Sequence, residues 1–238
     1  HATFYEGLPN FAVQPTTSVP GPGTYVQVYE RLAREGASEI LSIHMAGSLS
    51  AVANSARLAA EEFETIPVTV FDSGNLTLGT GLQVLAAARA VAEGRSMVEI
   101  VAQLEDMAAR TYCFAVLDTL EFLRRSGRLS SFQWGLGSVL QIKPILKMNG
   151  GVAEMERVRT SNGAHGRLMA LVEELGPLET LAVVHTHAPE ARRAALRQRA
   201  AHLFPKSEQV LEAEVTPVIG AHIGPQALGF VAVQARTV

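Results

Sequence analysis

The chain of 238 residues is long enough for one large α/β domain or two packed domains, and 47% of its residues are hydrophobic while 18% are charged. This composition supports a sizeable buried core and excludes a disordered chain. Twenty Lys and Arg against 23 Asp and Glu leave a net charge of −3, which provides no positive field for a nucleic acid. No apolar run reaches the roughly 18–20 residues of a membrane-spanning helix, so we expect no stable membrane insertion.

The first part of the chain alternates between helical and strand patterns. Apolar residues at helical spacing predict helices, in chain order, over 25–33, 49–63, 78–93 and 97–110. Compact β-rich runs predict strands over 39–44 and 67–72 and from residue 112. Strands that alternate with helices of this length favour parallel βαβ units with right-handed crossovers.

After residue 117 the pattern becomes antiparallel. The ranges 142–147 and 152–158 flank Asn149, Gly150 and Gly151, a sequence typical of a tight hairpin turn. Further predicted elements are, in chain order, a helix over 161–175, a strand over 180–185, a helix from 189 and strands over 210–214 and 230–233. These tail strands favour a mixed or antiparallel sheet.

The change of pattern near residue 110 predicts two α/β domains that pack closely, because no repeat and no low-complexity linker separates them. We expect an N-terminal parallel βαβ domain over 1–110 and a C-terminal α/β domain with a mixed or antiparallel sheet over 111–238. The single cysteine, Cys113, lies in the apolar run 112–117 and has no partner for an internal disulfide. A buried reduced thiol at this position agrees with a reducing, cytoplasmic location.

Polar residues gather at three predicted junctions between a strand and a helix, 15–20, 47–50 and 72–75. Ligands of open parallel sheets bind beyond the carboxyl ends of the strands, where helix N-termini offer free N–H groups. The hydroxyls of Thr17, Ser50 and Ser73 are therefore candidates for holding a small carboxylate or phosphate. Taken singly, each hydroxyl also suits an ordinary helix cap or turn.

Three further side chains are candidates for contact with an anion. Arg128 lies in a loop that contains Ser and Gly, and Arg159 lies at a predicted strand end, where a guanidinium binds an oxyanion in bidentate fashion. Each arginine also suits a contact that ties a loop to a neighbouring carboxylate or carbonyl. His222 lies among glycines in the run 220–225, which permits close approach to a ligand but also suits a structural histidine in a tight turn.

Several cofactor classes have no matching motif. His185 and His187 stand at a predicted strand end, where we expect their side chains to point to opposite faces, and no Cys, Asp or Glu lies at ligand spacing around them. We therefore expect no metal site. The chain contains neither Gly-x-Gly-x-x-Gly after a strand nor Gly-x-x-x-x-Gly-Lys-Ser/Thr, so we expect no dinucleotide or ATP site of the usual kinds.

Short motifs are ordered along the whole chain. They are Thr17-Ser18-Val19-Pro20, Leu49-Ser50-Ala51 with Asn54-Ser55-Ala56, Asp72-Ser73 with Leu78-Gly79, Thr119-Leu120-Glu121-Phe122-Leu123, Ser126-Gly127-Arg128, Ile142-Lys143-Pro144-Ile145-Leu146, Arg159-Thr160 and Gly220-Ala221-His222-Ile223-Gly224-Pro225. In this order they resemble the DegV family of fatty-acid-binding proteins.

The chain departs from the family pattern at several positions. Ala51 and Val52 stand where the family usually has Gly-Thr, Gln226 follows the proline where a second glycine is common, and Ser126 replaces one of two glycines. The family's first strand with its Asp-Ser-Thr motif has no counterpart here, and the chain begins with His1. We therefore expect that strand to belong to a segment before His1.

The resemblance implies a two-domain fold that encloses one long-chain fatty acid in an apolar tunnel, without a cofactor and without catalysis of its own. By similarity, the carboxylate is bound by Thr17, Ser18, Ser50 and His222. Contacts to the head group or a partner are expected, less directly, from Ser73, Arg128, Arg159 and Gly224. In bacterial relatives such a protein presents the carboxylate to a separate fatty acid kinase, which forms an acyl phosphate, so that kinase is the expected partner.

Two alternatives stay open. A serine-type hydrolase would use Ser50 and His222 with Asp72, but the Gly-x-Ser-x-Gly elbow of such enzymes is absent around Ser50. A sensor of a non-lipid small molecule on the same fold would have a collapsed apolar tunnel.

Overall fold

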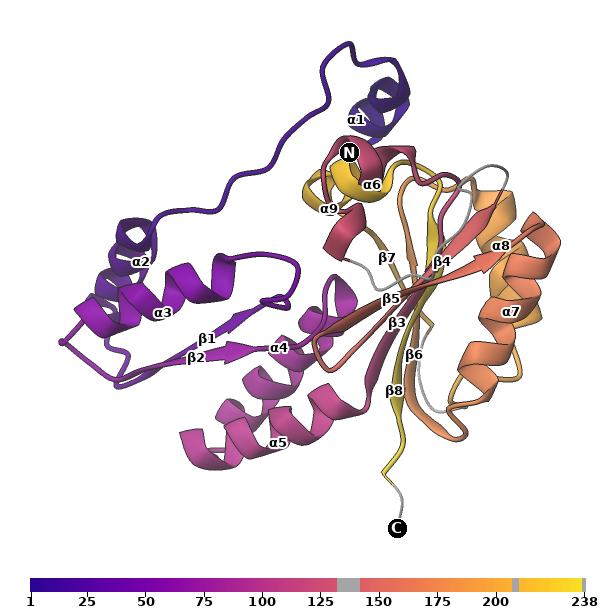
Figure 1. Ribbon diagram of the computed structural model, residues 1–238. Coiled ribbons are helices and arrows are strands. Elements are labelled where there is room, and N and C mark those ends of the chain that lie inside the picture. Colours follow the sequence, from indigo (N-terminus) through magenta and orange to yellow (C-terminus); the bar gives the residue numbers. More distant parts are fainter. Residues whose placement is uncertain (132–141, 207–209, 237–238) are drawn as a thin grey trace.

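A computed structural model describes residues 1–131, 142–206 and 210–236, which form a smaller and a larger sheet (Figure 1). In the smaller sheet β1 (Ile40–His44) and β2 (Val68–Asp72) are parallel and in register from Ile40 opposite Val68. Helix α3 (Val52–Glu62) connects them and packs against α2 (Pro22–Arg34). This is the predicted parallel βαβ unit.

The larger sheet has six strands in the order β5-β4-β3-β8-β6-β7. Their bounds are β3 (Thr111–Val116), β4 (Lys143–Asn149), β5 (Val152–Val158), β6 (Leu178–His185), β7 (Leu211–Glu214) and β8 (Leu228–Gln234). All neighbours are antiparallel except the parallel pair β6 and β7, which makes the sheet mixed as predicted. The hairpin of β4 and β5 turns at Gly150 and Gly151, both with positive φ.

Helices cover the larger sheet on both faces. Helices α7 (Ser161–Glu173) and α8 (Glu190–Arg199) lie on one face. The short helices α6 (Glu121–Arg125) and α9 (Pro217–Ile223) contact each other and cover the other face. Helices α4 (Leu78–Ala92) and α5 (Met97–Ala109) pack against each other, and α4 contacts both sheets.

Alternating residues of each central strand enter two different cores. On β3, Phe114 and Val116 pack with α7, whereas Cys113 packs with α6 and α9. On β8, Phe230 belongs to the core beneath α7, and Val231 belongs to the core beneath α6 and α9. The period of two residues in a strand therefore separates the two faces of the sheet.

The structure corrects some of the local predictions. Helix α1 (Ala2–Gly7) and the 3-10 turns Leu8–Asn10 and Leu129–Ser131, as well as α6, were not predicted. The cluster 15–20 does not follow a strand but lies in the segment between Leu8–Asn10 and α2. His222 lies on helix α9 and not in a tight turn, because Pro217 starts a helix that continues through both flanking residues.

The domain boundary proposed near residue 110 stays a prediction, and residue 111 is the first residue of β3. Helix α1 at the start of the chain packs against α9 of the later half. None of the helices in the described ranges has both the length and the apolar character needed to cross a membrane.

Candidate functional site

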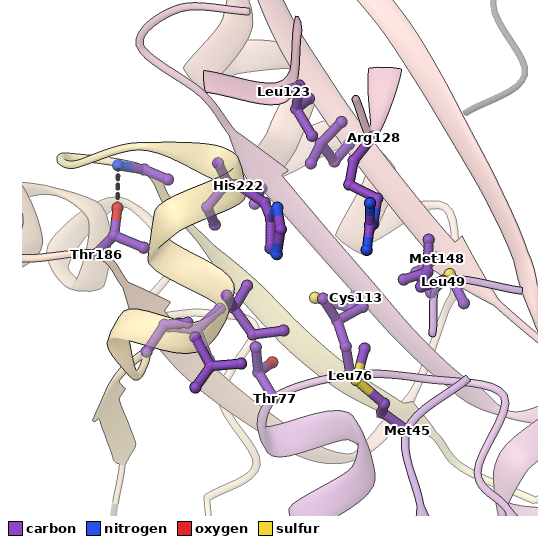
Figure 2. A pocket seen from close by; sticks show the side chains of 18 of the residues that line it. Met45, Leu49, Leu76, Thr77, Cys113, Leu123, Arg128, Met148, Thr186 and His222 are labelled. Atoms are coloured by element: carbon purple, nitrogen blue, oxygen red, sulfur yellow. Dashed lines mark hydrogen bonds between the residues drawn. The ribbon is translucent and has the colours of Figure 1, made fainter. Parts of the chain in front are cut away.

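An apolar cavity lies between the loops that follow β1 and β2, the inner face of β3 and β4, and helices α6 and α9 (Figure 2). It encloses about 990 Å³ of space free of protein atoms, its open mouth included. Apolar side chains dominate its wall, among them Met45, Leu49, Leu76, Leu123, Met148 and Ile223. A cavity with a mainly apolar wall and a few polar groups is typical of a site for a small apolar molecule.

Four of the predicted site residues line this one cavity. Thr17 comes from the segment before α2, Ser50 from the loop before α3, Arg128 from the turn after α6 and His222 from α9. Figure 2 shows the side chains of Arg128 and His222 pointing into the same space. The fold therefore brings together polar groups that lie far apart in the sequence.

His222 and Thr17 contact each other at the cavity wall. Thr17 Oγ1 and His222 Nε2 are hydrogen-bonded at 2.9 Å, and His222 Nδ1 is buried without a hydrogen-bond partner among the described residues. Burial and the positive charge of Arg128 both lower the pKa of His222. The imidazole is therefore neutral near pH 7, with one nitrogen available as donor and the other as acceptor.

The other four predicted residues do not line the cavity. Ser18 and Arg159 are exposed. Ser73 is fully buried, and its hydroxyl lies 2.8 Å from that of Thr80, so its role in the described structure is to hold the start of α4. Gly224 ends α9 with φ of 80°, and a Cβ there would lie 2.3 Å from the ring of Phe122.

Asp72 positions the loop that carries Ser50. Its two carboxylate oxygens accept hydrogen bonds from the backbone N–H groups of Gly47 and Gly74, each at 2.9 Å. A Cβ at Gly47 would lie 2.8 Å from the carboxylate, so only glycine permits this approach. The sequence motif around Asp72 pointed to this region, but the loop-holding role of the carboxylate was not predicted.

Cys113 and Thr77 also line the cavity, and no sequence pattern pointed to Thr77. Burial raises the pKa of the Cys113 thiol to about 12, and the nearby Thr77 hydroxyl opposes this rise. The prediction of a buried thiol is confirmed. A thiol with this pKa is protonated at neutral pH and reacts slowly.

A separate polar crevice contains both His185 and His187, together with Arg193, Glu212 and Glu214. The expectation that the two histidines point to opposite faces was wrong: β6 ends at His185, His187 follows in the next turn with a φ of 53°, and both line the same crevice. His187 Nδ1 lies 2.9 Å from Glu214 Oε1. Within 1–131, 142–206 and 210–236, no group of three His, Cys, Asp or Glu side chains is arranged to hold a metal ion.

Among the described residues, Ser50, His222 and Asp72 do not form the hydrogen-bonded triad of a serine hydrolase. In the described part of the chain no hydrogen bond links Ser50 to His222, because Nε2 of His222 is used by Thr17 and its Nδ1 has no partner. Asp72 is used by backbone N–H groups instead of the imidazole. The relay from carboxylate to imidazole to hydroxyl is therefore absent from this arrangement.

Comparisons with known proteins agree on one family. A family model described as an uncharacterised protein of the DegV family matches residues 1–235. A DegV domain-containing protein of Streptomyces coelicolor is 38% identical over 219 residues, covering 91% of this chain and 77% of the relative. Protein DegV of Bacillus subtilis is 34% identical over 233 residues, covering 96% of this chain and 82% of the relative.

Solved structures give the same result for the fold. A DegV family protein from Thermus thermophilus, described by its fatty acid binding, superposes with a TM-score of 0.84 at 34% identity over 98% of this chain and 84% of its own. DegV of Bacillus subtilis, described as a fatty acid binding protein, gives a TM-score of 0.85 at 31% identity, with the same coverage of 98% and 84%.

Proposed function

Because the chain belongs to the DegV family, we propose that it binds one long-chain fatty acid in the apolar cavity, without catalysing a reaction itself. The carboxylate would lie against Thr17, Ser50 and His222. One observation carries the proposal: these polar groups meet at a cavity whose remaining wall is mainly apolar. The fatty acid binding attributed to the relatives from Thermus thermophilus and Bacillus subtilis supports the same ligand class.

The apolar wall supplies most of the affinity in this proposal. Burial of roughly a dozen methylenes at about 0.8 kcal/mol each contributes on the order of 10 kcal/mol before the costs of association. This gain suits the capture of a ligand that is sparingly soluble in water. The head group then needs only enough donors to offset the loss of its hydration.

The donors suit a carboxylate better than a neutral head group. The hydroxyl of Ser50 has a proton to donate, and the hydrogen-bonded pair of Thr17 and His222 keeps one more, whichever of the two donates in their mutual bond. Hydrogen bonds to a charged acceptor are about twice as strong as neutral ones. Arg128 adds a positive charge in the same cavity. The single negative charge of the ligand is thus met locally, although the chain as a whole carries −3.

Mass spectrometry of the purified protein tests the proposal. We expect native spectra and organic extracts to show one fatty acid per chain, either as purified or after incubation with palmitate and oleate. A double variant, Ser50→Ala with Thr17→Ala, is expected to bind palmitate at least about tenfold more weakly, because two charge-assisted hydrogen bonds are lost. Ser18→Ala is the matched control, since Ser18 is exposed outside the cavity. A protein that stays ligand-free would refute the proposal.

The same site suits presentation of the carboxylate to a fatty acid kinase, and this step is part of our proposal. Thr17 and Ser50 are only partly buried, which supports a head group near the rim of the cavity. Arg128 would stabilise the acyl phosphate that the kinase forms. We expect a fatty acid kinase to consume ATP with palmitate only when this protein is present, and Ser50→Ala with Thr17→Ala to reduce that rate. ATP consumption that does not depend on this protein would contradict the partnership.

A further inference from the structure

Tyr5 fastens helix α1 to the start of α9. Its side chain is fully buried at 1% exposure, although it lies on a helix of six residues near the start of the chain. The hydroxyl donates to the carbonyl oxygen of Val215 at 2.5 Å and lies 3.2 Å from that of Thr216. These carbonyls precede α9, which carries His222. Burial and the nearby carboxylate of Glu214 raise the pKa of Tyr5, so the hydroxyl stays protonated and able to donate.

The ring of Tyr5 packs against Gly220 of α9, where any larger residue would clash with it. A Cβ at Gly220 on α9 would lie 2.3 Å from the Tyr5 hydroxyl oxygen and 2.4 Å from Cε1. The ring also stacks on His187, with centroids 6.0 Å apart and planes 6° from parallel. The position of α9 relative to α1 is therefore set by direct contact and not by a flexible connection.

The segment that follows Tyr5 in the chain leads to Thr17, the hydrogen-bond partner of His222. We call residues 1–21 the N-terminal strap, which Figure 1 shows passing from α1 above α9 to α2 beside the smaller sheet. Along it, Gln14 Nε2 donates to the carbonyl oxygen of Ala221 at 2.7 Å, and Thr17 bonds His222. At its far end the Pro20 carbonyl accepts from Ser55 at 2.7 Å. Both members of the Thr17–His222 pair thus stand on elements that Tyr5 holds.

We propose that Tyr5 is a positioning residue of the head-group site, which sets the Thr17–His222 geometry from outside the cavity. Tyr5 does not line the cavity, so it acts through α9 and the N-terminal strap. This proposal rests on the proposed function, since it takes Thr17 and His222 as the pair that meets the carboxylate. It predicts that variants which disrupt the contacts of Tyr5 weaken the binding of the charged head group and leave the binding of the acyl tail nearly unchanged.

The first test removes only the Tyr5 hydroxyl. For Tyr5→Phe we expect the dissociation constant of palmitate to rise about threefold to tenfold, the effect of one buried hydrogen bond, while that of methyl palmitate changes by less than about twofold. Nitrogen-15 spectra of the imidazoles, with His222→Gln to assign the signal, report His222 without any ligand. We expect the His222 signal to shift in Tyr5→Phe. Equal weakening of palmitate and methyl palmitate, or an unshifted signal, would overturn the proposal.

Gly220→Ala disturbs the contact between Tyr5 and Gly220 without altering Tyr5 or the N-terminal strap, and a double-mutant cycle with Tyr5→Ala tests the coupling of the two residues. Gly220→Ala forces the Tyr5 ring out, because its Cβ has no room beside the ring. We expect this variant to weaken palmitate binding as Tyr5→Ala does, and to have no further effect in the Tyr5→Ala background, where the space is free. Additive losses would contradict the coupling between the two residues.

The two proposals fail in different ways. If the unaltered protein binds neither palmitate nor methyl palmitate, the proposed function is refuted, and the His222 signal still decides whether Tyr5 sets its environment. If palmitate binds and Tyr5→Phe, Tyr5→Ala and Gly220→Ala leave its affinity unchanged, the role of Tyr5 is refuted and the fatty acid site stands. Thermal unfolding of each variant shows that the comparison is made on folded protein.

Discussion

The two faces of the six-stranded sheet are built from the same strands, yet one is a solid core and the other borders a cavity. On the face covered by α7 and α8, large side chains such as Phe114 and Phe230 are buried and pack with Leu168. On the opposite face β3 presents Cys113 and Ala115, which are small, toward the cavity. On β3, residue volume at alternate positions, and not hydrophobicity alone, therefore distinguishes the two faces.

The helices that cover the two faces differ in length. Helix α7 has 13 residues and presents a continuous apolar stripe, whereas α6 has five residues and α9 has seven. Short helices joined by loops leave a gap that no side chain fills. A continuous helix on a sheet therefore favours stability, and interrupted helices leave room for a ligand.

The largest effect is expected in the solid core. Phe230 is fully buried and makes an edge contact with Phe204, so Phe230→Ala removes a ring from a close-packed site. We expect the free energy of unfolding to fall by about 3–5 kcal/mol, measured by urea denaturation. Palmitate affinity of the folded fraction should stay unchanged, because the ring faces away from the cavity. A loss of affinity without a loss of stability would contradict the division between the faces.

A matched pair of alanines compares the faces directly. Ala232 is fully buried in the solid core, and Ala115 lines the cavity from the neighbouring strand. Ala232→Leu should destabilise the protein by about 1–3 kcal/mol through overpacking. Ala115→Leu should leave the unfolding midpoint nearly unchanged and reduce palmitate affinity, because the added carbons occupy ligand space. The reverse pattern in calorimetry and titration would show that the cavity face is the packed one.

His222 on the cavity face is expected to make palmitate affinity depend on pH. Burial and Arg128 lower the pKa of His222 in the free protein, and a carboxylate bound beside the imidazole would raise it. The complex therefore takes up a proton between these two pKa values, and palmitate affinity rises as the pH falls through the pKa of the complex. We expect a gain on the order of threefold to tenfold, tenfold for each unit between the two pKa values. His222→Gln should abolish the gain, and methyl palmitate should show none.

The smallest effect concerns the reactivity of the only cysteine. Burial raises the pKa of Cys113 to about 12, so little thiolate is present at neutral pH and iodoacetamide should label it slowly. Bound palmitate should slow the labelling further, because Cys113 lines the cavity. Mass spectrometry of timed samples measures the rates, with guanidinium-unfolded protein as the fast reference. Equal rates with and without palmitate would place the ligand away from β3.

The sequence predicted the regular elements well where periodicity was long or turn chemistry was specific. The helices on either side of β2 and the hairpin at Gly150 and Gly151 were confirmed, because each rests on a local pattern. Helices α1, α6 and α9 were missed, since segments of five to seven residues contain too few turns to show an apolar stripe. The tertiary contacts of Tyr5 and Gly220 stabilise such short helices, and no local pattern predicts them.

The candidate site was predictable as a set of residue types but not as a geometry. Family motifs named Thr17, Ser50, Arg128 and His222, and the structure places all four around one cavity. They equally named Ser73, whose hydroxyl proves to be buried against Thr80. A serine after a strand is suitable for either role, and only the packing of α4 decides between them.

The hydrogen bond between Thr17 and His222 joins residues 205 positions apart, which has a consequence for how the protein matures. During synthesis Thr17 leaves the ribosome early, and at about 5–20 residues per second α9 follows only many seconds later. Until then the apolar wall on β3 and β4 lacks the cover of α9 and the imidazole of His222. A fatty acid bound at that last step would stabilise the native state by mass action, so that the cargo itself helps to complete the fold.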